Sequence, residues 1–135
     1  STVVIDDYAH HPTEIEATLD SIKLYAKLKG VENIISIWQP HKYSRTISNL
    51  ERFKECFKGS KRLVILPVWS AGEDEVSIDF EGNFGGYDLL MADRIKRDAE
   101  GVSILRGNDV IETIKNSVIV GFGAGDITYQ LRGLV

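Results

Sequence analysis

The sequence predicts an α/β fold in which a mostly parallel sheet lies between two layers of helices. Short apolar runs, continuous and rich in β-branched residues, alternate along the chain with segments whose apolar residues recur at helical spacing. Clusters of polar residues directly follow most of these runs, as they do where parallel strands end at a binding edge. Strands and helices in this order require right-handed crossovers and indicate a three-layer, Rossmann-like architecture.

The first strand and the first helix can be placed from their boundaries. Residues 3–5 form a β-branched run that is typical of a buried strand. Pro12 suits the first position of a helix, and Thr13 with Glu16 can alternatively form a capping box there. Apolar residues then recur at helical spacing as far as Gly30, which supplies a stop.

The alternation continues through the middle of the chain. Residues 34–38 and 63–66 are expected as the second and third strands. Between them, a polar loop over residues 41–46 leads into a helix that ends at Gly59. Residues 70–86 are acidic and rich in glycine, and we expect them to be irregular.

The last third of the chain repeats the pattern of helices and apolar runs. The elements expected there are a helix at about 87–98, a strand at 102–105, a short helix at 110–114, a strand at 118–120 and a closing helix at 127–134. The sheet would therefore have five strands, with its polar clusters gathered at one edge.

Composition narrows the class of protein. With 135 residues, 43% of them hydrophobic and 27% charged, the chain is expected to form a single soluble domain spanning residues 1–135. A net charge of −4 gives no electrostatic reason to expect nucleic acid or an anionic membrane as a partner. No apolar run approaches the roughly 20 residues that span a bilayer. The single cysteine, Cys56, excludes an internal disulfide and is compatible with a cytoplasmic protein.

The beginning of the chain is also informative. It opens on Ser1 and enters a strand within two residues, and its only methionine is Met91. We therefore expect a domain excised from a longer chain.

The first polar cluster combines two carboxylates, a phenol and two imidazoles. Its residues are Asp6, Asp7, Tyr8, His10 and His11. A carboxylate at a strand end can accept hydrogen bonds from a ribose diol or bind a metal, and imidazoles can contact phosphate, transfer protons or ligate zinc. The plainer alternative is that one aspartate caps a turn and one histidine points to solvent.

The second cluster carries three potentially cationic groups, His41, Lys42 and Arg45. Lys42 and Arg45 are three residues apart, so one helical turn can point them in the same direction. With a helix N-terminus behind them, they would form an anion site suited to carboxylate or phosphate. The alternative is a solvated basic turn.

Two further segments carry weaker signals. Residues 121–126 resemble a dinucleotide fingerprint, but their glycine spacing is wrong, so a turn that lets the backbone approach a ligand or a neighbouring strand fits better. Residues 69–74 are most simply a surface turn. A phosphate-binding loop of the Walker A type occurs nowhere in the chain. We expect Asp126, with Asp7, His10, His41 and Arg45, to lie on one edge of the sheet.

These clusters, in this order, resemble the C-terminal domain of the Mur ligases over essentially the whole chain. The motifs are Asp6-Asp7-Tyr8-Ala9-His10-His11-Pro12-Thr13-Glu14, Gln39-Pro40-His41-Lys42-Tyr43-Ser44-Arg45-Thr46, Ala71-Gly72-Glu73 and Gly123-Ala124-Gly125-Asp126. The second histidine before proline favours the alanine-adding branch of the family. The sequence departs from the family at Lys42, where arginine is common, and at Trp69-Ser70, where Tyr-Pro is usual.

The resemblance implies the third domain of a three-domain enzyme. In such an enzyme ATP phosphorylates the carboxylate of UDP-N-acetylmuramate, and the amine of L-alanine attacks the acyl phosphate and expels phosphate. The missing central domain would hold ATP and Mg²⁺, and this chain alone would be inactive. No metal ligand is expected here.

Roles for individual residues follow from the same resemblance. Asp7 would contact the ribose hydroxyls of ATP, and His10 its terminal phosphate region. His41, Lys42 and Arg45 would hold the alanine carboxylate and the oxygens of the acyl phosphate. Tyr8 would lie beside the amino-acid pocket. His10 and Arg45 are the candidate catalytic residues.

Three other functions remain open from the residues alone. A related ligase that adds a whole peptide to the same sugar shares this architecture. A metal-dependent hydrolase could use Asp6, Asp7, His10 and His11 as ligands. A non-catalytic nucleotide-sensing module would bind ATP measurably as an isolated domain.

Overall fold

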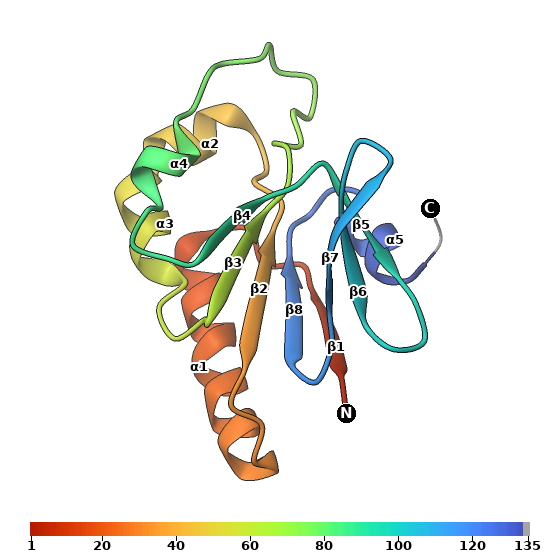
Figure 1. The fold of residues 1–135 in the computed structure, drawn as a ribbon. Helices are drawn as coiled ribbons and strands as arrows, with labels where there is room; N and C mark the ends of the chain where they lie inside the picture. The colour runs from red at the N-terminus through yellow and green to blue at the C-terminus, as the bar shows by residue number, and fades with distance from the viewer. Residues whose placement is uncertain (134–135) are drawn as a thin grey trace.

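The computed structural model of the chain describes residues 1–133, which form two sheets (Figure 1). The larger sheet is entirely parallel, with the order β1 (Val3–Asp7), β8 (Val118–Phe122), β2 (Ile34–Trp38), β3 (Arg62–Ile65) and β4 (Leu89–Met91). The smaller sheet is antiparallel, with the order β5 (Arg94–Arg97), β6 (Val102–Arg106) and β7 (Asp109–Ile114). The predicted α/β fold with a mostly parallel sheet is therefore confirmed.

The two faces of the parallel sheet are covered differently (Figure 1). On one side lie the helices α1 (Pro12–Lys29), α2 (Tyr43–Ser48), α3 (Leu50–Cys56) and α4 (Phe80–Asn83). On the other side lie the antiparallel sheet and α5 (Ile127–Leu131). The expectation of a helical layer on both faces thus holds only in part, because β5–β7 supply most of the second layer.

The central strands are buried on both faces, which explains why they read as continuous apolar runs. All five residues of β2 and all five of β8 are buried. In β2, Ile34 and Trp38 face the helices, whereas Ile35 and Ile37 face the antiparallel sheet. The Trp38 ring is the centre of the helix-side core, and its centroid lies 4.8 Å from that of Phe53.

The prediction of a helix at residues 87–98 is wrong. The segment instead forms β4 and β5, which belong to different sheets. Leu90 and Ile95 fit helical spacing, but β4 is held by pairing with β3. In β5 only Ile95 is buried, and the residues on either side of it are exposed. Neighbouring side chains of a strand point to opposite faces in this way. Pairing with distant strands therefore decided the structure of this segment.

The prediction of a short helix at residues 110–114 is also wrong, because this segment belongs to the strand β7. It pairs with β6 across a two-residue turn, Gly107-Asn108, in which Gly107 has φ +57°. A glycine–asparagine pair between two apolar runs is a recognised hairpin signal, and it could have been found from the sequence. The strand expected at 102–105 is β6, which lies in the antiparallel sheet rather than the parallel one.

Several boundaries differ from those expected. Pro12 does begin α1, but the backbone N–H groups before it are bonded by Glu14 rather than by a Thr13–Glu16 box. The polar loop over 41–46 is partly the helix α2, and the following helix ends at Cys56, before Gly59. Residues 70–86 are irregular except for α4. Residue 134, in the expected closing helix, lies outside the described residues.

Cys56 is part of the core. It is buried, and its thiol donates a hydrogen bond to the carbonyl oxygen of Phe53 over 3.3 Å. Burial raises the pKa of this thiol far above its usual range, so Cys56 is held as a neutral apolar group.

Candidate functional site

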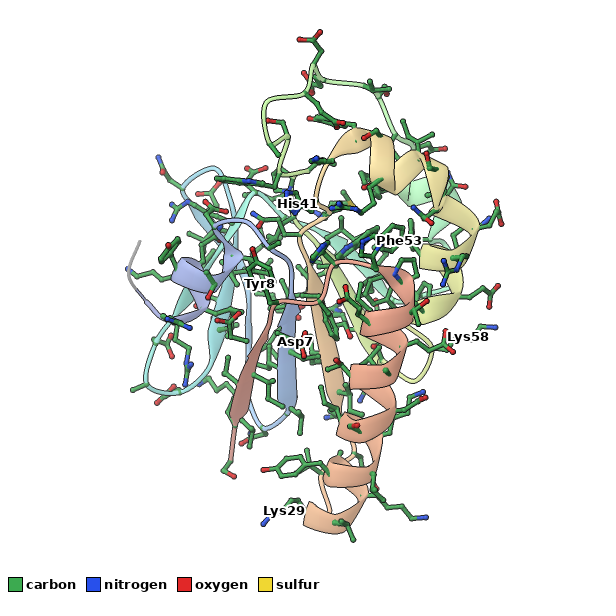
Figure 2. The ribbon with its side chains drawn as sticks, turned by 180° about the vertical axis from the view of Figure 1, so that it is seen from behind. Asp7, Tyr8, Lys29, His41, Phe53 and Lys58 are labelled. Atoms are coloured by element: carbon green, nitrogen blue, oxygen red, sulfur yellow. The ribbon has the colours of Figure 1, made fainter. Side chains whose placement is uncertain are left out.

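Parallel register brings the polar clusters to one edge of the larger sheet. Asp7 pairs with Phe122, Phe122 with Trp38, and Trp38 with Ile65, so four strands end in the same row. The segments that follow these residues therefore leave the sheet together. Figure 2 shows Asp7, Tyr8 and His41 near this end of the molecule, with Lys29 at the opposite end.

The two aspartates of the first cluster point to opposite faces of the sheet, as neighbours in a strand do. The Asp7 carboxylate accepts hydrogen bonds from the Ala9 N–H at 2.7 Å and the Thr18 hydroxyl at 3.1 Å, and so turns the chain from β1 into α1. The Asp6 carboxylate instead accepts a hydrogen bond from Thr128 and lies 3.4 Å from the Arg132 guanidinium, near α5. Asp6 and Asp7 therefore cannot join one metal site.

His10 has one ring nitrogen committed within the chain. Its Nδ1 lies 3.1 Å from the carbonyl oxygen of Tyr8, and a carbonyl can only accept, so Nδ1 carries the proton. The other nitrogen, Nε2, is left for a further partner. The His10 ring centroid lies 4.9 Å from that of His11 and 5.6 Å from that of His41, while the exposed Tyr8 ring packs edge-on against it.

The second cluster is fixed by a bridge between the loops that follow β2 and β3. His41 pairs with Trp69 as an isolated parallel bridge, and the Lys42 N–H donates to the Trp69 carbonyl oxygen over 2.8 Å. Lys42 has φ +71°, a conformation that is costly for a residue with a side chain. The Arg45 guanidinium lies 3.4 Å from the His41 carbonyl oxygen. The bridge thus holds three potentially cationic groups together.

His41 is kept neutral by its surroundings. Its pKa is lowered from the usual 6.5 chiefly by burial, and further by the charges of Arg45, His10 and Lys42. Its Nδ1 is buried and has no hydrogen-bond partner among residues 1–133. A neutral imidazole beside cations can accept a hydrogen bond or a proton from a ligand.

We expect the His41 ring to titrate below pH 6.5, and Arg45→Gln to raise its pKa by removing a nearby positive charge. The unfolded chain then binds a proton near pH 6.5 that the folded chain does not. The free energy of unfolding should therefore fall as the pH drops through 6.5 toward the folded pKa. NMR titration of the histidine rings measures both pKa values, and urea unfolding between pH 7.5 and 5.5 measures the stability. A His41 midpoint at or above 6.5 would contradict this account.

The glycine turn after β8 serves a close approach between loops. A Cβ on Gly123 would lie 2.9 Å from Ile127 and 3.1 Å from the Gln39 carbonyl oxygen, and one on Gly125 would lie 2.6 Å from the Trp69 ring. The Gln39 amide donates to Asp126 over 2.6 Å and accepts from the Ile127 N–H over 3.2 Å. The turn therefore approaches the loops that follow β2 and β3, and Asp126 lies on the predicted edge.

One N–H group at the N-terminus of α2 is bonded within the protein. The Glu73 carboxylate reaches over from the loop after β3 and accepts hydrogen bonds from the N–H and the hydroxyl of Ser44. The Ser44 N–H is therefore not free to bind an anion, whereas the side chains of Lys42 and Arg45 do not take part in this contact. The sequence pattern predicts a surface turn at Glu73. Only the family motif that contains Glu73 indicates a role in the site.

The described residues contain no group of three or more histidine, cysteine or carboxylate side chains arranged to hold a metal ion. In that part of the chain, no helix is long and apolar enough to cross a membrane.

The sequence of the chain is similar to those of known proteins. Residues 1–115 match the family described as "Mur ligase, glutamate ligase domain". The chain belongs to this Mur ligase family. It is 51% identical over 131 residues to a UDP-N-acetylmuramate–L-alanine ligase of Campylobacter curvus and 52% identical over 133 residues to one of Helicobacter pylori. Each match covers 97% of this chain but 30% of the relative.

The fold of this Mur ligase domain also matches a solved structure. A crystal structure of a UDP-N-acetylmuramate–alanine ligase from Thermotoga maritima superimposes with a TM-score of 0.61 at 23% sequence identity. The match covers 98% of this chain and 26% of that one, so it establishes the fold of the domain.

The site of the Mur ligase domain is suited to anionic oxygens. Lys42 and Arg45 supply positive charge and N–H donors, and the His10 Nε2, which has no hydrogen-bond partner among the described residues, can donate to an oxygen when both nitrogens of the ring carry a proton. The exposed Tyr8 ring packs against the His10 ring, which in turn lies 5.6 Å from the His41 ring.

Proposed function

We propose that this chain is the third domain of a three-domain ATP-dependent ligase that joins L-alanine to UDP-N-acetylmuramate in peptidoglycan precursor synthesis. The observation that carries the proposal is the identity of about 50% to ligases named for this reaction, combined with a cationic cluster at the carboxyl edge of the sheet. The chain spans about 30% of those relatives, so the remaining domains would complete the enzyme.

The chemistry needs what this cluster offers. A carboxylate is a poor electrophile, and phosphorylation by ATP gives it a leaving group. The alanine amine then forms the new C–N bond, the bond between carbon and phosphate oxygen breaks, and phosphate leaves with its charge. Cations held nearby offset the charge that develops on these oxygens.

Each residue of the site has a proposed task. Arg45, Lys42 and His41 bind the alanine carboxylate and the acyl-phosphate oxygens. His10 donates a hydrogen bond from Nε2 to the terminal phosphate region of ATP when the ring carries both protons, since its Nδ1 is bonded to a backbone carbonyl oxygen. The Asp7 carboxylate accepts hydrogen bonds from the ribose hydroxyls of ATP. It uses the lone pairs that are not engaged by its hydrogen bonds within the chain. Tyr8 borders the amino-acid pocket.

Mg²⁺ and the phosphate-binding loop are assigned to the preceding central domain. The described residues provide no cluster of metal ligands, so no step of the mechanism here passes through the metal. Closure of the domains would bring this site to the nucleotide.

The same observations weigh against the alternatives. A metal-dependent hydrolase that uses Asp6 and Asp7 together is not favoured, because these carboxylates bond to Thr128 and Thr18 respectively, on opposite faces of the sheet. The relatives compared above are named for L-alanine, which favours a single amino acid over a whole peptide as the second substrate.

The test is to supply the full-length protein with ATP, Mg²⁺, UDP-N-acetylmuramate and L-alanine, and to measure phosphate release and the mass of the product. Ligation of alanine by the full-length protein is expected, with background activity and almost no ATP binding for the isolated 135-residue chain. Significant ligation by the isolated chain would contradict the three-domain proposal. Turnover with a peptide but not with alanine would instead indicate the recycling ligase.

A further inference from the structure

The loop after β3 ends in a tight turn that aims Glu73 at α2. The Glu73 N–H donates to the Ser70 carbonyl oxygen over 3.1 Å, closing a four-residue turn. Its two central residues both have left-handed backbones, with φ +50° at Ala71 and φ +90° at Gly72. A Cβ on Gly72 would meet nothing within 4 Å, so glycine is favoured there by its backbone conformation rather than by lack of space.

The Glu73 carboxylate is bonded twice to one residue of α2. One oxygen accepts the Ser44 N–H over 3.1 Å, and the other accepts the Ser44 hydroxyl. The pKa of Glu73 is lowered from its usual value mainly by the hydrogen bond from the Ser44 hydroxyl, and next by the hydrogen bond from the Ser44 N–H. The positive charge of Lys42 lowers this pKa further. Glu73 is therefore ionised at neutral pH and lies beside the second cluster.

The helix α2 is held in its first turn by Glu73 and by Thr46, whose N–H and hydroxyl both donate to the Lys42 carbonyl oxygen, over 3.2 and 2.8 Å. It is six residues long, and the residue that precedes it, Lys42, makes no side-chain capping hydrogen bond. Helices this short are not stable by themselves. The first turn nevertheless carries Arg45, whose positive charge and that of Lys42 both act on His41, and two like charges near one group repel each other.

We propose that Glu73 is a positioning residue for the amino-acid site. It caps the first turn of α2 from a neighbouring loop and so fixes the directions in which Lys42 and Arg45 present their charges. The bridge between His41 and Trp69 fixes the other end of the same segment. Glu73 acts through Ser44 and does not contact the substrate. This inference rests on the proposed function, because it names the carboxylate of the incoming amino acid as the group that these cations meet.

The first test is kinetic, on the full-length protein. Glu73→Ala should raise the KM for L-alanine about three- to tenfold, as expected for loss of a charged cap, while the KM for ATP stays within about twofold. Glu73→Gln should restore the alanine KM to within about twofold of the wild type, because an amide can accept the Ser44 N–H and donate to its hydroxyl. Glu75→Ala is the matched control, since Glu75 is exposed on the same loop and has no hydrogen bond among the described residues.

The second test is structural and independent of activity. Hydrogen exchange of the Ser44 amide, followed by NMR, should become about tenfold faster in Glu73→Ala and remain unchanged in Glu75→Ala. Should Glu73→Ala fail to fold, Ser44→Ala removes one of the two hydrogen bonds and should raise the alanine KM about two- to threefold.

The outcomes separate this inference from the proposed function. A rise in the alanine KM alone, with rescue by glutamine, supports it. The inference is overturned if Glu73→Ala changes all kinetic constants equally. It is also overturned if the alanine KM does not change in Glu73→Ala, or in Ser44→Ala where that variant replaces it. If the wild-type protein shows no alanine-dependent phosphate release, the proposed function fails, whereas the exchange of the Ser44 amide still decides whether Glu73 caps α2.

Discussion

Replacing Arg45 by alanine is expected to lower kcat/KM for L-alanine ten- to a hundred-fold in the full-length protein, with little change in the apparent KM for ATP. A charge-assisted hydrogen bond is worth about 1.5–3 kcal/mol, which sets this range. The Arg45 guanidinium lies 3.4 Å from the His41 carbonyl oxygen, so its position is fixed before the substrate arrives. Arg52→Ala is a suitable control, because Arg52 is an exposed arginine that bonds Thr13 on α1.

The comparison with His10 makes the test sharper. His10→Ala should reduce the rate mainly through the terms that depend on ATP, because we place its Nε2 near the nucleotide phosphate. Steady-state kinetics, in which one substrate is varied at a time, separate the two effects. If Arg45→Ala folds normally and leaves the alanine kinetics intact, the second cluster is not the amino-acid site.

Replacing Trp38 by alanine is expected to destabilise the domain by about 3–5 kcal/mol, a large part of the stability of a typical domain. The Trp38 side chain is fully buried, and its ring contacts those of Phe53, Phe57 and Phe84 at centroid distances of 4.8, 5.1 and 5.4 Å. Deleting the ring leaves a cavity that several elements border, and surrounding side chains fill such cavities only in part.

Urea unfolding measures this loss of stability. Leu28→Ala is the control: Leu28 is 78% exposed on α1, and its replacement should change the free energy of unfolding by less than about 0.5 kcal/mol. Trp38→Phe should retain much of the stability, because it leaves a smaller cavity. A loss below about 1 kcal/mol for Trp38→Ala would show that the aromatic core is not organised around this ring.

Much of the parallel sheet could be predicted because its strands carry their signal locally. The apolar runs of β2 and β8 are buried on both faces, so nearly every residue in them is apolar. The segment from Tyr87 to Asp98 carries no such signal. Its strand β4 has three residues, and its strand β5 has one buried residue of four. They are defined by pairing of Leu89 with Leu63, 26 residues away along the chain, and of Arg94 with Leu105, 11 residues away.

The candidate site divides in the same way. Clusters at strand ends could be assigned to one edge, and the contacts among His10, His41 and Arg45 confirm that assignment. The capping of α2 by Glu73 could not be foreseen, because it joins a loop residue to a helix residue 29 positions away along the chain.

The sequence by itself determined the α/β class, the edge at which the polar residues gather and the types of side chain available there. These properties depend on periodicity within single segments and on the rule that parallel strands end together. Only the tertiary structure decided which side chains share a surface. Asp6 and Asp7 are neighbours in the chain but lie on opposite faces, whereas Glu73 and Ser44 are 29 residues apart and share a hydrogen bond. Such contacts depend on register and on hydrogen bonds between distant segments, which no local pattern encodes.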